Sequence, residues 1–218
     1  MSLYASIGLV STRQQIIEIG LINYLWPGLI VLVAVPLFKY KANLFLPIGL
    51  VIAFAGVALS MTQGEQFSVE LMLRNLREDT LAYFLALLGA ISWAVYSNLS
   101  RLWGRDAGPE AVCCFITLTG VLVFPFRYLF QEASVFNWTS AWQLLYMALV
   151  PTFLAYVLWD GAMKRGNIIL VATLSFFTPL IATAMSWFIL ELTATYLMWI
   201  ACGLVLTGSL LTKNSIVD

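Results

Sequence analysis

The sequence predicts an all-α protein that crosses a membrane several times, and its composition is the first reason. Of its 218 residues, 61% are hydrophobic and only 10% are charged, whereas a soluble domain carries about 25% charged residues. So few charges do not cover a water-facing surface, and the remaining apolar surface must therefore face lipid. The apolar residues also gather in runs of about 20, the length that an α-helix needs to cross the hydrocarbon core.

Seven apolar segments have this length, and a shorter apolar stretch, residues 3–10, precedes them. The segments are residues 16–38, 44–61, 81–103, 111–130, 142–163, 168–190 and 196–211. Most joints between them are short and polar. Residues 63–80 form a longer joint in which apolar and charged residues alternate, which is typical of a helix lying in the membrane interface.

The basic residues predict the orientation of the bundle. One set of alternate joints, together with the C-terminal tail, holds Lys39, Lys41, Arg101, Arg105, Lys164, Arg165 and Lys213. The opposite side holds the other four, Arg13, Arg74, Arg77 and Arg127. Because cytoplasmic loops carry the excess of Lys and Arg, we expect the first set, and with it the C-terminus, in the cytoplasm and the protein in the inner (plasma) membrane.

The chain also resembles itself at an offset of 152 residues, which places Pro27 on Pro179 and Gly56 on Gly208. The helix around Pro27 and the helix around Pro179 are expected to cross the membrane in opposite senses. Inverted repeats of this kind are typical of secondary transporters, whose binding sites lie near the midplane where the repeats meet.

The two repeats differ in length. Residues 81–213 form a five-helix repeat, whereas residues 1–61 supply two spans and a stub; residues 62–80 form the outer interfacial linker and 214–218 a cytoplasmic tail. Moving residue 81 back by 152 positions gives a point about seventy residues before Met1. We therefore expect an inverted-repeat bundle of which about the first two and a half helices are missing from this sequence.

Three stretches resemble a known family. They are STRQQIIEIGLINYLWP (residues 11–27), LAYFLALLGAISWAVYSNLSR (81–101) and LAYVLWDGAMKRGNIILVATLSFFTPL (154–180). Together they resemble the drug/metabolite transporter superfamily in its ten-helix EamA-type branch, and NYLWP (23–27) most resembles the bacterial aromatic amino-acid exporters. The resemblance implies a 5+5 inverted fold, cytoplasmic termini and export by alternating access.

The two symmetry-related prolines are the first functional candidates. Pro27 and Pro179 each lie near the centre of a span, where proline removes a hydrogen-bond donor and kinks the helix. The carbonyls of Asn23 and Ser175 then need another partner. We expect both prolines to act as hinges beside a central cavity, with static kinks as the alternative. Pro36 and Pro151 lie nearer helix ends, which indicates structural roles.

Polar and aromatic residues near these prolines form the predicted substrate site, because uncharged polar groups at mid-membrane face the bundle or a cavity. A pocket of indole, phenol, amide and hydroxyl groups suits a solute with a flat ring; interhelical packing is the alternative for each residue. The predicted substrate-binding residues are Asn23, Tyr24, Trp26, Trp93, Tyr96, Ser97, Tyr156, Ser175, Phe176 and Thr178.

The acidic residues fit helix ends better than a midplane coupling site. Asp160 precedes Lys164 by four residues, a spacing that favours an ion pair within one helix. Glu18 and Glu191 lie near the outer ends of their helices and are interpreted in the same way. No carboxylate occupies the middle of a predicted span, where a proton-coupled drug antiporter would be expected to carry one.

The sequence favours a carrier over an enzyme. It has no His and no H-E-x-x-H or G-x-S-x-G motif, so we expect no catalytic residue, metal site or cofactor. The expected partners are a small-molecule substrate and the lipid bilayer, without nucleic acid, and we expect a monomer. The main hypothesis is export of small solutes, above all aromatic amino acids. The alternatives are a drug or other metabolite carrier, and a truncated membrane protein that transports nothing.

Overall fold

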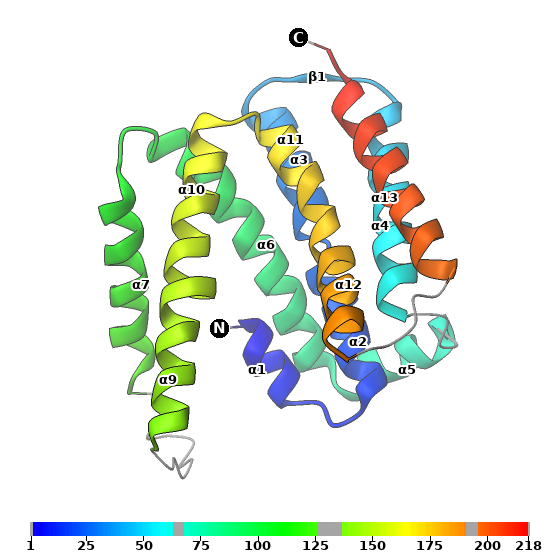
Figure 1. Ribbon diagram of the computed structural model, residues 1–218. Helices are drawn as coiled ribbons and strands as arrows, with labels where there is room; N and C mark the ends of the chain where they lie inside the picture. The colour runs from blue at the N-terminus through cyan, green and yellow to red at the C-terminus, as the bar shows by residue number, and fades with distance from the viewer. Residues whose placement is uncertain (1, 63–67, 126–136, 191–195, 218) are drawn as a thin grey trace. The chain divides into compact units, whose positions relative to one another are not determined.

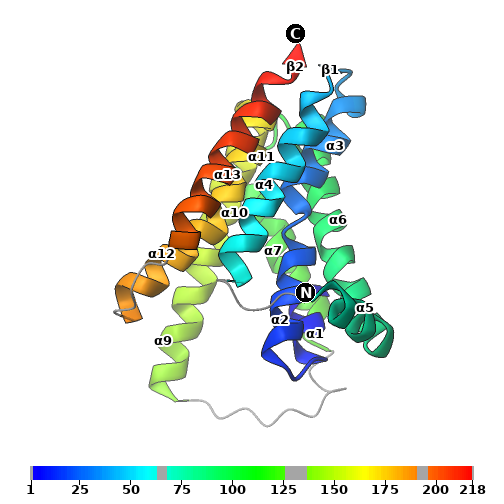
Figure 2. The ribbon, with the colours of Figure 1, turned by 90° about the vertical axis from the view of Figure 1, so that its right-hand side faces the viewer.

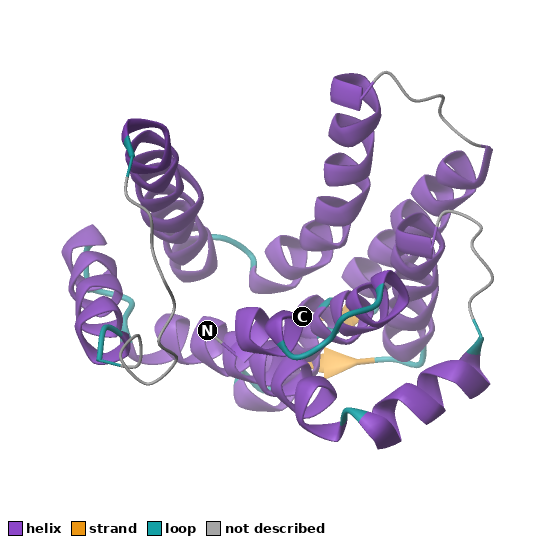
Figure 3. Cartoon of the chain, turned by 90° about the horizontal axis from the view of Figure 1, so that it is seen from below, coloured by secondary structure: helices purple, strands orange, loops and turns teal. Residues whose placement is uncertain are grey.

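The computed structural model describes residues 2–62, 68–125, 137–190 and 196–217. These residues form helices almost throughout, with one short pair of strands (Figure 3). The chain divides into two compact units, one of Met1–Asn98 with Ile168–Asp218 and one of Leu99–Asn167. These units do not coincide with the two predicted repeats, because helices from both repeats pack together in the first unit.

Six helical segments of the described chain are long and apolar enough to cross a membrane, which confirms an all-α polytopic membrane protein. They are Arg13–Leu37, Phe45–Thr62, Thr80–Trp103, Trp138–Arg165, Ile168–Met185 and Tyr196–Asn214. The predicted span 111–130 corresponds to a shorter helix, α7 (Pro109–Val123). The last five residues of that prediction, 126–130, lie outside the described residues.

The first unit contains the N-terminal helices and the last two spans. Its elements are α1 (Ser2–Gly8), α2 (Arg13–Asn23), α3 (Trp26–Leu37), β1 (Lys41–Ala42), α4 (Phe45–Thr62), α5 (Val69–Glu78), most of α6 (Thr80–Trp103), α11 (Ile168–Leu174), η2 (Ser175–Phe177), α12 (Thr178–Leu190), α13 (Tyr196–Asn214) and β2 (Ile216–Val217). Helix α5, within the predicted interfacial linker, lies crosswise to the spanning helices (Figures 1 and 2).

Helices α4 and α13 pack side by side through three glycines (Figures 1 and 2). A Cβ atom added at Gly208 would lie 2.6 Å from the carbonyl oxygen of Gly49, and one at Gly56 would lie 2.8 Å from that of Ala201. Small residues allow this close approach of two backbones, which is how many membrane helices associate. The symmetry-related glycines Gly56 and Gly208 therefore lie in one helix pair.

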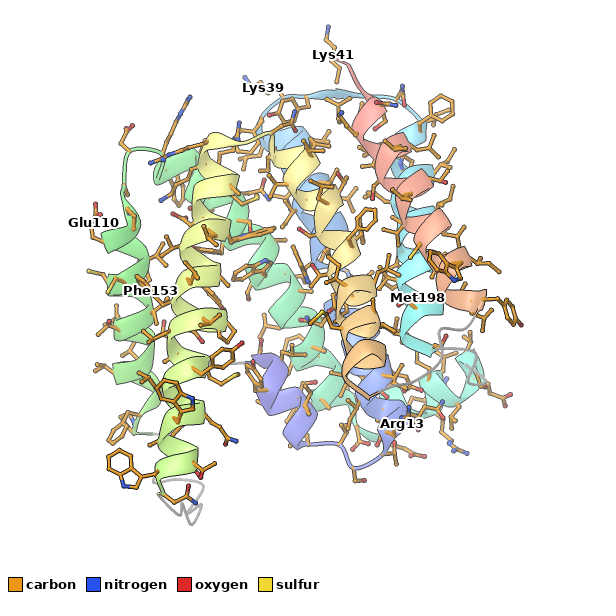
Figure 4. The ribbon with its side chains drawn as sticks, in the orientation of Figure 1. Arg13, Lys39, Lys41, Glu110, Phe153 and Met198 are labelled. Carbon is orange, nitrogen blue, oxygen red and sulfur yellow. The ribbon has the colours of Figure 1, made fainter. Side chains whose placement is uncertain are left out.

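The ends of this unit agree with the predicted alternation of joints. Lys41 and Ala42 of β1 pair antiparallel with Val217 and Ile216 of β2, so the α3–α4 joint and the C-terminus meet at one end. Figure 4 shows Lys39 and Lys41 at this end and Arg13 at the other. The α3–α4 joint and the C-terminal tail, both predicted on the basic side, thus lie at the same end of this unit.

Both hinge candidates lie where a span is interrupted. Helix α2 ends at Asn23, and α3 restarts at Trp26 with Pro27 in its first turn. Helix α11 ends at Leu174, a 3₁₀ turn follows, and α12 begins at Thr178, directly before Pro179. The carbonyl of Ser175 accepts from the backbone N–H of Thr178, so the turn itself replaces the bond that Pro179 cannot make.

The second unit contains α7 and a long rod of α9 (Trp138–Met147), η1 (Ala148–Leu154) and α10 (Ala155–Arg165), which run side by side (Figure 1). The expectation that Pro151 lies near a helix end is wrong, because it lies in the middle of this rod. There η1 is a π-helix. The Thr152 hydroxyl donates to the carbonyl of Met147 at 2.8 Å, which replaces the bond that Pro151 cannot donate.

We expect Gly208→Ala to lower the stability of the protein by about 1–3 kcal/mol, because the new methyl group would overlap the backbone of α4. The matched control is Gly203→Ala on the same helix, where an added Cβ meets nothing within 4 Å. The measurement is the unfolding temperature of the purified protein in detergent. Equal temperatures for the two variants would contradict the close contact.

Candidate functional site

Three aromatic side chains on α3 and α6 form the centre of the candidate site. The ring centroids of Trp26 and Trp93 lie 6.3 Å apart in an edge-to-face arrangement. Trp93 and Tyr96 lie 5.4 Å apart with tilted rings. We call Trp26, Trp93 and Tyr96 the aromatic cluster. All three side chains are only partly buried, so they retain surface that a flat, apolar group can contact.

Asn23 faces α6, the helix that contains Trp93 and Tyr96. Its Oδ1 atom would lie 3.4 Å from a Cβ atom added at Gly89 of α6, and Gly89 precedes Trp93 by one helical turn. Asn23 and Trp26 lie on either side of the break that precedes Pro27, and both side chains point toward α6. An amide therefore lies next to the aromatic cluster.

Tyr24 and Ser97 also belong to this unit. Tyr24 lies within the break between α2 and α3 and is partly buried, whereas Ser97 is fully buried on α6. Ala86, Ala90 and Ala94, on the small-residue stripe of α6, are all at most 1% exposed. These three alanines recur every four residues, a spacing that allows close packing of this helix against its neighbours.

The residues around Pro179 differ in their exposure. Phe176 is 1% exposed, and its ring lies 3.8 Å from the position of an added Cβ at Gly28. The Ser175 hydroxyl donates to the carbonyl of Val171 at 2.8 Å. Thr178 is exposed. In this structure Phe176 therefore packs between helices, and of the three predicted residues only Thr178 is exposed.

Tyr156 is a residue of α10 and lies in the second unit, where 37% of its surface is exposed. Its assignment as a substrate-binding residue stays a prediction.

Asn98 of α6 was not among the predicted site residues. It is fully buried, and its Nδ2 donates to the carbonyls of Ala94 at 2.9 Å and Ile30 at 3.2 Å. These two carbonyls determine the orientation of the amide, because the flipped amide would face oxygen with oxygen. The Oδ1 atom has no hydrogen-bond partner. It is an unused buried acceptor between α3 and α6.

The interpretation of Glu18 as one partner of an ion pair is wrong for the described chain. Glu18 is fully buried and accepts hydrogen bonds from Gln14, Asn75 and Tyr83, all neutral side chains. Its polar neighbours on α2 were visible in the sequence as Gln14, Gln15 and Glu18. Their partners on α5 and α6 were not, because no local pattern pairs residues more than fifty positions apart. Glu191 lies outside the described residues.

The expected ion pair of Asp160 is confirmed in the second unit. Lys164 Nζ lies 2.6 Å from Asp160 Oδ2, and both side chains are at most 7% exposed. Ser100 donates to the same carboxylate, and Lys164 also donates to the carbonyl of Ala107 at 3.1 Å. Arg101 donates to the carbonyls of Met163 and Gly166 at 2.8 and 2.6 Å. These contacts join the end of α6 to the end of α10.

The described residues contain no group of three or more His, Cys, Asp or Glu side chains that could hold a metal ion. The polar and aromatic groups of the first unit instead offer hydrogen bonds and ring faces. This arrangement can bind an organic solute without any covalent chemistry.

The sequence profile of the EamA-like transporter family matches residues 80–213 of the chain. This match covers more than half of the sequence and includes the second predicted repeat. The chain belongs to the EamA-like transporter family.

Individual relatives match nearly the whole chain. The aromatic amino acid exporter YddG of Escherichia coli K12 is 30% identical over 206 residues, and the protein of the same name from Salmonella typhimurium is 32% identical over 207 residues. Each alignment covers 94% of this chain and 70% of the relative. A solved crystal structure superposes with a TM-score of 0.80 at 27% sequence identity, covering 98% of this chain and 70% of that one.

We expect Asp160→Asn to destabilise the protein by about 3–5 kcal/mol, because it leaves the buried ammonium of Lys164 without its counter-charge. The matched control is Asp106→Asn, a carboxylate in an exposed turn of the same unit. Unfolding temperatures in detergent measure the difference. If both variants unfold at the same temperature as the parent protein, the buried pair is not what holds these helix ends.

Proposed function

We propose that this family member exports amino acids with aromatic side chains by alternating access, without changing them chemically. The observation that carries the proposal is the aromatic cluster of Trp26, Trp93 and Tyr96 with Asn23 beside it. The relatives named as aromatic amino acid exporters support it.

The chemistry of the site suits such a substrate. Indole and phenol rings offer faces and edges to a flat ring, and edge-to-face contacts contribute about 0.5–1.5 kcal/mol beyond the buried area. An asparagine amide both donates and accepts, so it suits the carboxylate or the ammonium of an amino acid. A phosphorylated cargo would favour Arg or Lys instead, and the predicted spans carry none near their centres.

The two interrupted spans support alternating access. In each span a short non-helical or 3₁₀ segment ends two residues before the proline. Discontinuous helices at the midplane are a recurring feature of secondary transporters. We propose that Pro27 and Pro179 mark the two hinges. Asn23, Tyr24 and Trp26 lie at the first one, so bending there would change the distance between Trp26 and Trp93.

We expect Trp26→Ala to raise the half-saturating concentration for tryptophan and phenylalanine by about twofold to tenfold, because one ring contact is lost. The measurement is export of labelled amino acids by cells that express the gene in full. Trp199→Ala, a tryptophan of α13 that is 74% exposed, is the control and should transport normally. Unchanged kinetics in Trp26→Ala would contradict the site, and failure to move any amino acid would contradict the function.

We further propose that the protein resides in the inner membrane with its C-terminus in the cytoplasm, since Lys39, Lys41 and the paired strand β2 share one end of the first unit. A fluorescent protein fused after Asp218 should then fluoresce, and alkaline phosphatase fused there should be inactive. The opposite pair of results would place the C-terminus outside.

A further inference from the structure

Glu18 and its surroundings form a polar contact between three helices that the transport site itself does not explain. Glu18 belongs to an apolar span, and its side chain is fully buried within the protein. Gln14 Nε2 donates to its Oε1 at 3.0 Å, Asn75 Nδ2 donates to its Oε2 at 3.1 Å, and the Tyr83 hydroxyl donates to the same Oε2. Asn75 lies on α5 and Tyr83 on α6, so one carboxylate joins α2, α5 and α6.

The donors around Glu18 define its role as an acceptor. The amide nitrogens of Gln14 and Asn75 can only donate, and a carboxylate can accept several such bonds. In Glu18→Gln the new NH2 group would face the NH2 group of Gln14 or Asn75, so that two donors would oppose each other. Hydrogen bonds to a charged group are stronger than those between neutral groups, and a buried carboxylate that loses its donors carries a large desolvation cost.

A second contact lies one turn away. Gln15, which precedes Glu18 by three residues on α2, donates through Nε2 to Asp79 Oδ2 at 2.6 Å. The other end of the Gln15 amide is held by the Thr12 capping box at the start of α2. Gln15 and Glu18 therefore contact Asp79 and Asn75, which lie four residues apart at the end of α5. We call Gln14, Gln15, Glu18, Asn75, Asp79 and Tyr83 the Glu18 clasp.

The clasp is the main buried attachment of α5. Asn75 is the one residue of this helix that is buried, whereas Val69 and Leu73 are 62% and 53% exposed. The Arg74–Glu78 pair is also exposed, at 67% and 63%. A small apolar cluster of Ile19, Ala82, Tyr83 and Ala86, with Leu76 packed against it, completes the contact.

The Glu18 clasp lies on the helix that leads to the aromatic cluster. Helix α2 extends from Arg13 to Asn23 with Glu18 in its middle, and Trp26 follows after the break. Tyr83 and Trp93 lie on the same helix, α6. We propose that Glu18 is a positioning residue for transport, which holds α2 on α5 and α6 so that Trp26 stands against Trp93. This proposal rests on the proposed function for its effect on transport, but not for the contact itself.

The first experiment measures the clasp without transport. In the protein expressed from its gene in full, with Cys113, Cys114 and Cys202 replaced by alanine, Ala82→Cys places a thiol at a site that is 1% exposed beside the clasp. Adding Glu18→Gln or the milder Asn75→Ala should raise its rate of reaction with N-ethylmaleimide by about tenfold, because a charge-assisted hydrogen bond is lost. Glu78→Gln, an exposed carboxylate on α5, is the control and should leave the rate unchanged.

The exchange Glu18→Gln with Asn75→Asp moves the carboxylate to α5 and should return the rate to within about twofold of the parent. Parental rates in both Glu18→Gln and Asn75→Ala would overturn the clasp. If the double variant keeps the raised labelling rate, the contact between Glu18 and Asn75 is not what protects the thiol at position 82.

The second experiment tests positioning by a double-mutant cycle. Glu18→Gln should raise the half-saturating concentration for aromatic amino acids, and it should add less than about twofold when Trp26→Ala is already present, because both changes remove the same ring contact. Independent effects of the two substitutions would overturn the positioning role. If the protein exports no amino acid, the proposed function fails, while the thiol labelling still decides whether the clasp exists.

Discussion

Every backbone polar group in an apolar span must find its partner within the protein, and the rest of this structure depends on that constraint. Three prolines withdraw a hydrogen-bond donor near the middle of a described span, and at two of them another group donates to the carbonyl concerned. Pro179 follows a 3₁₀ turn in which Thr178 donates to the carbonyl of Ser175. Pro151 lies in a π-helix where the Thr152 hydroxyl serves the carbonyl of Met147. At Pro27 the helix ends and begins again.

These interruptions have different consequences for function. The breaks at Pro27 and Pro179 divide their spans into two helices, which allows each half to change direction. The π-helix at Pro151 leaves its rod continuous from Trp138 to Arg165. The symmetry-related prolines are therefore the better hinge candidates, and the aromatic cluster lies beside the first of them. Helices α4 and α13, which meet through Gly49, Gly56 and Gly208, contain no comparable break and offer a rigid support.

Buried polar groups join helices in both units. In the second unit the ion pair of Asp160 and Lys164 joins α10 to α6 and to the turn at Ala107. In the first unit the Glu18 clasp joins α2 to α5 and α6 without any cation. The difference follows from the partners available. Lys164 follows Asp160 on its own helix, whereas the described neighbours of Glu18 are amides and a phenol, which satisfy a carboxylate by donating to it.

The sequence by itself determined that the chain is a polytopic helical membrane protein, because hydropathy and span length depend on composition and local order alone. It also predicted the interruptions at Pro27 and Pro179 and the ion pair of Asp160, since each depends on residues within one helix. Only the tertiary structure decided the partners of Glu18, the burial of Phe176, the contact between Trp26 and Trp93 and the unused acceptor of Asn98. These depend on which faces of distant helices meet, and in a chain that is apolar on every side hydrophobic periodicity does not select the face.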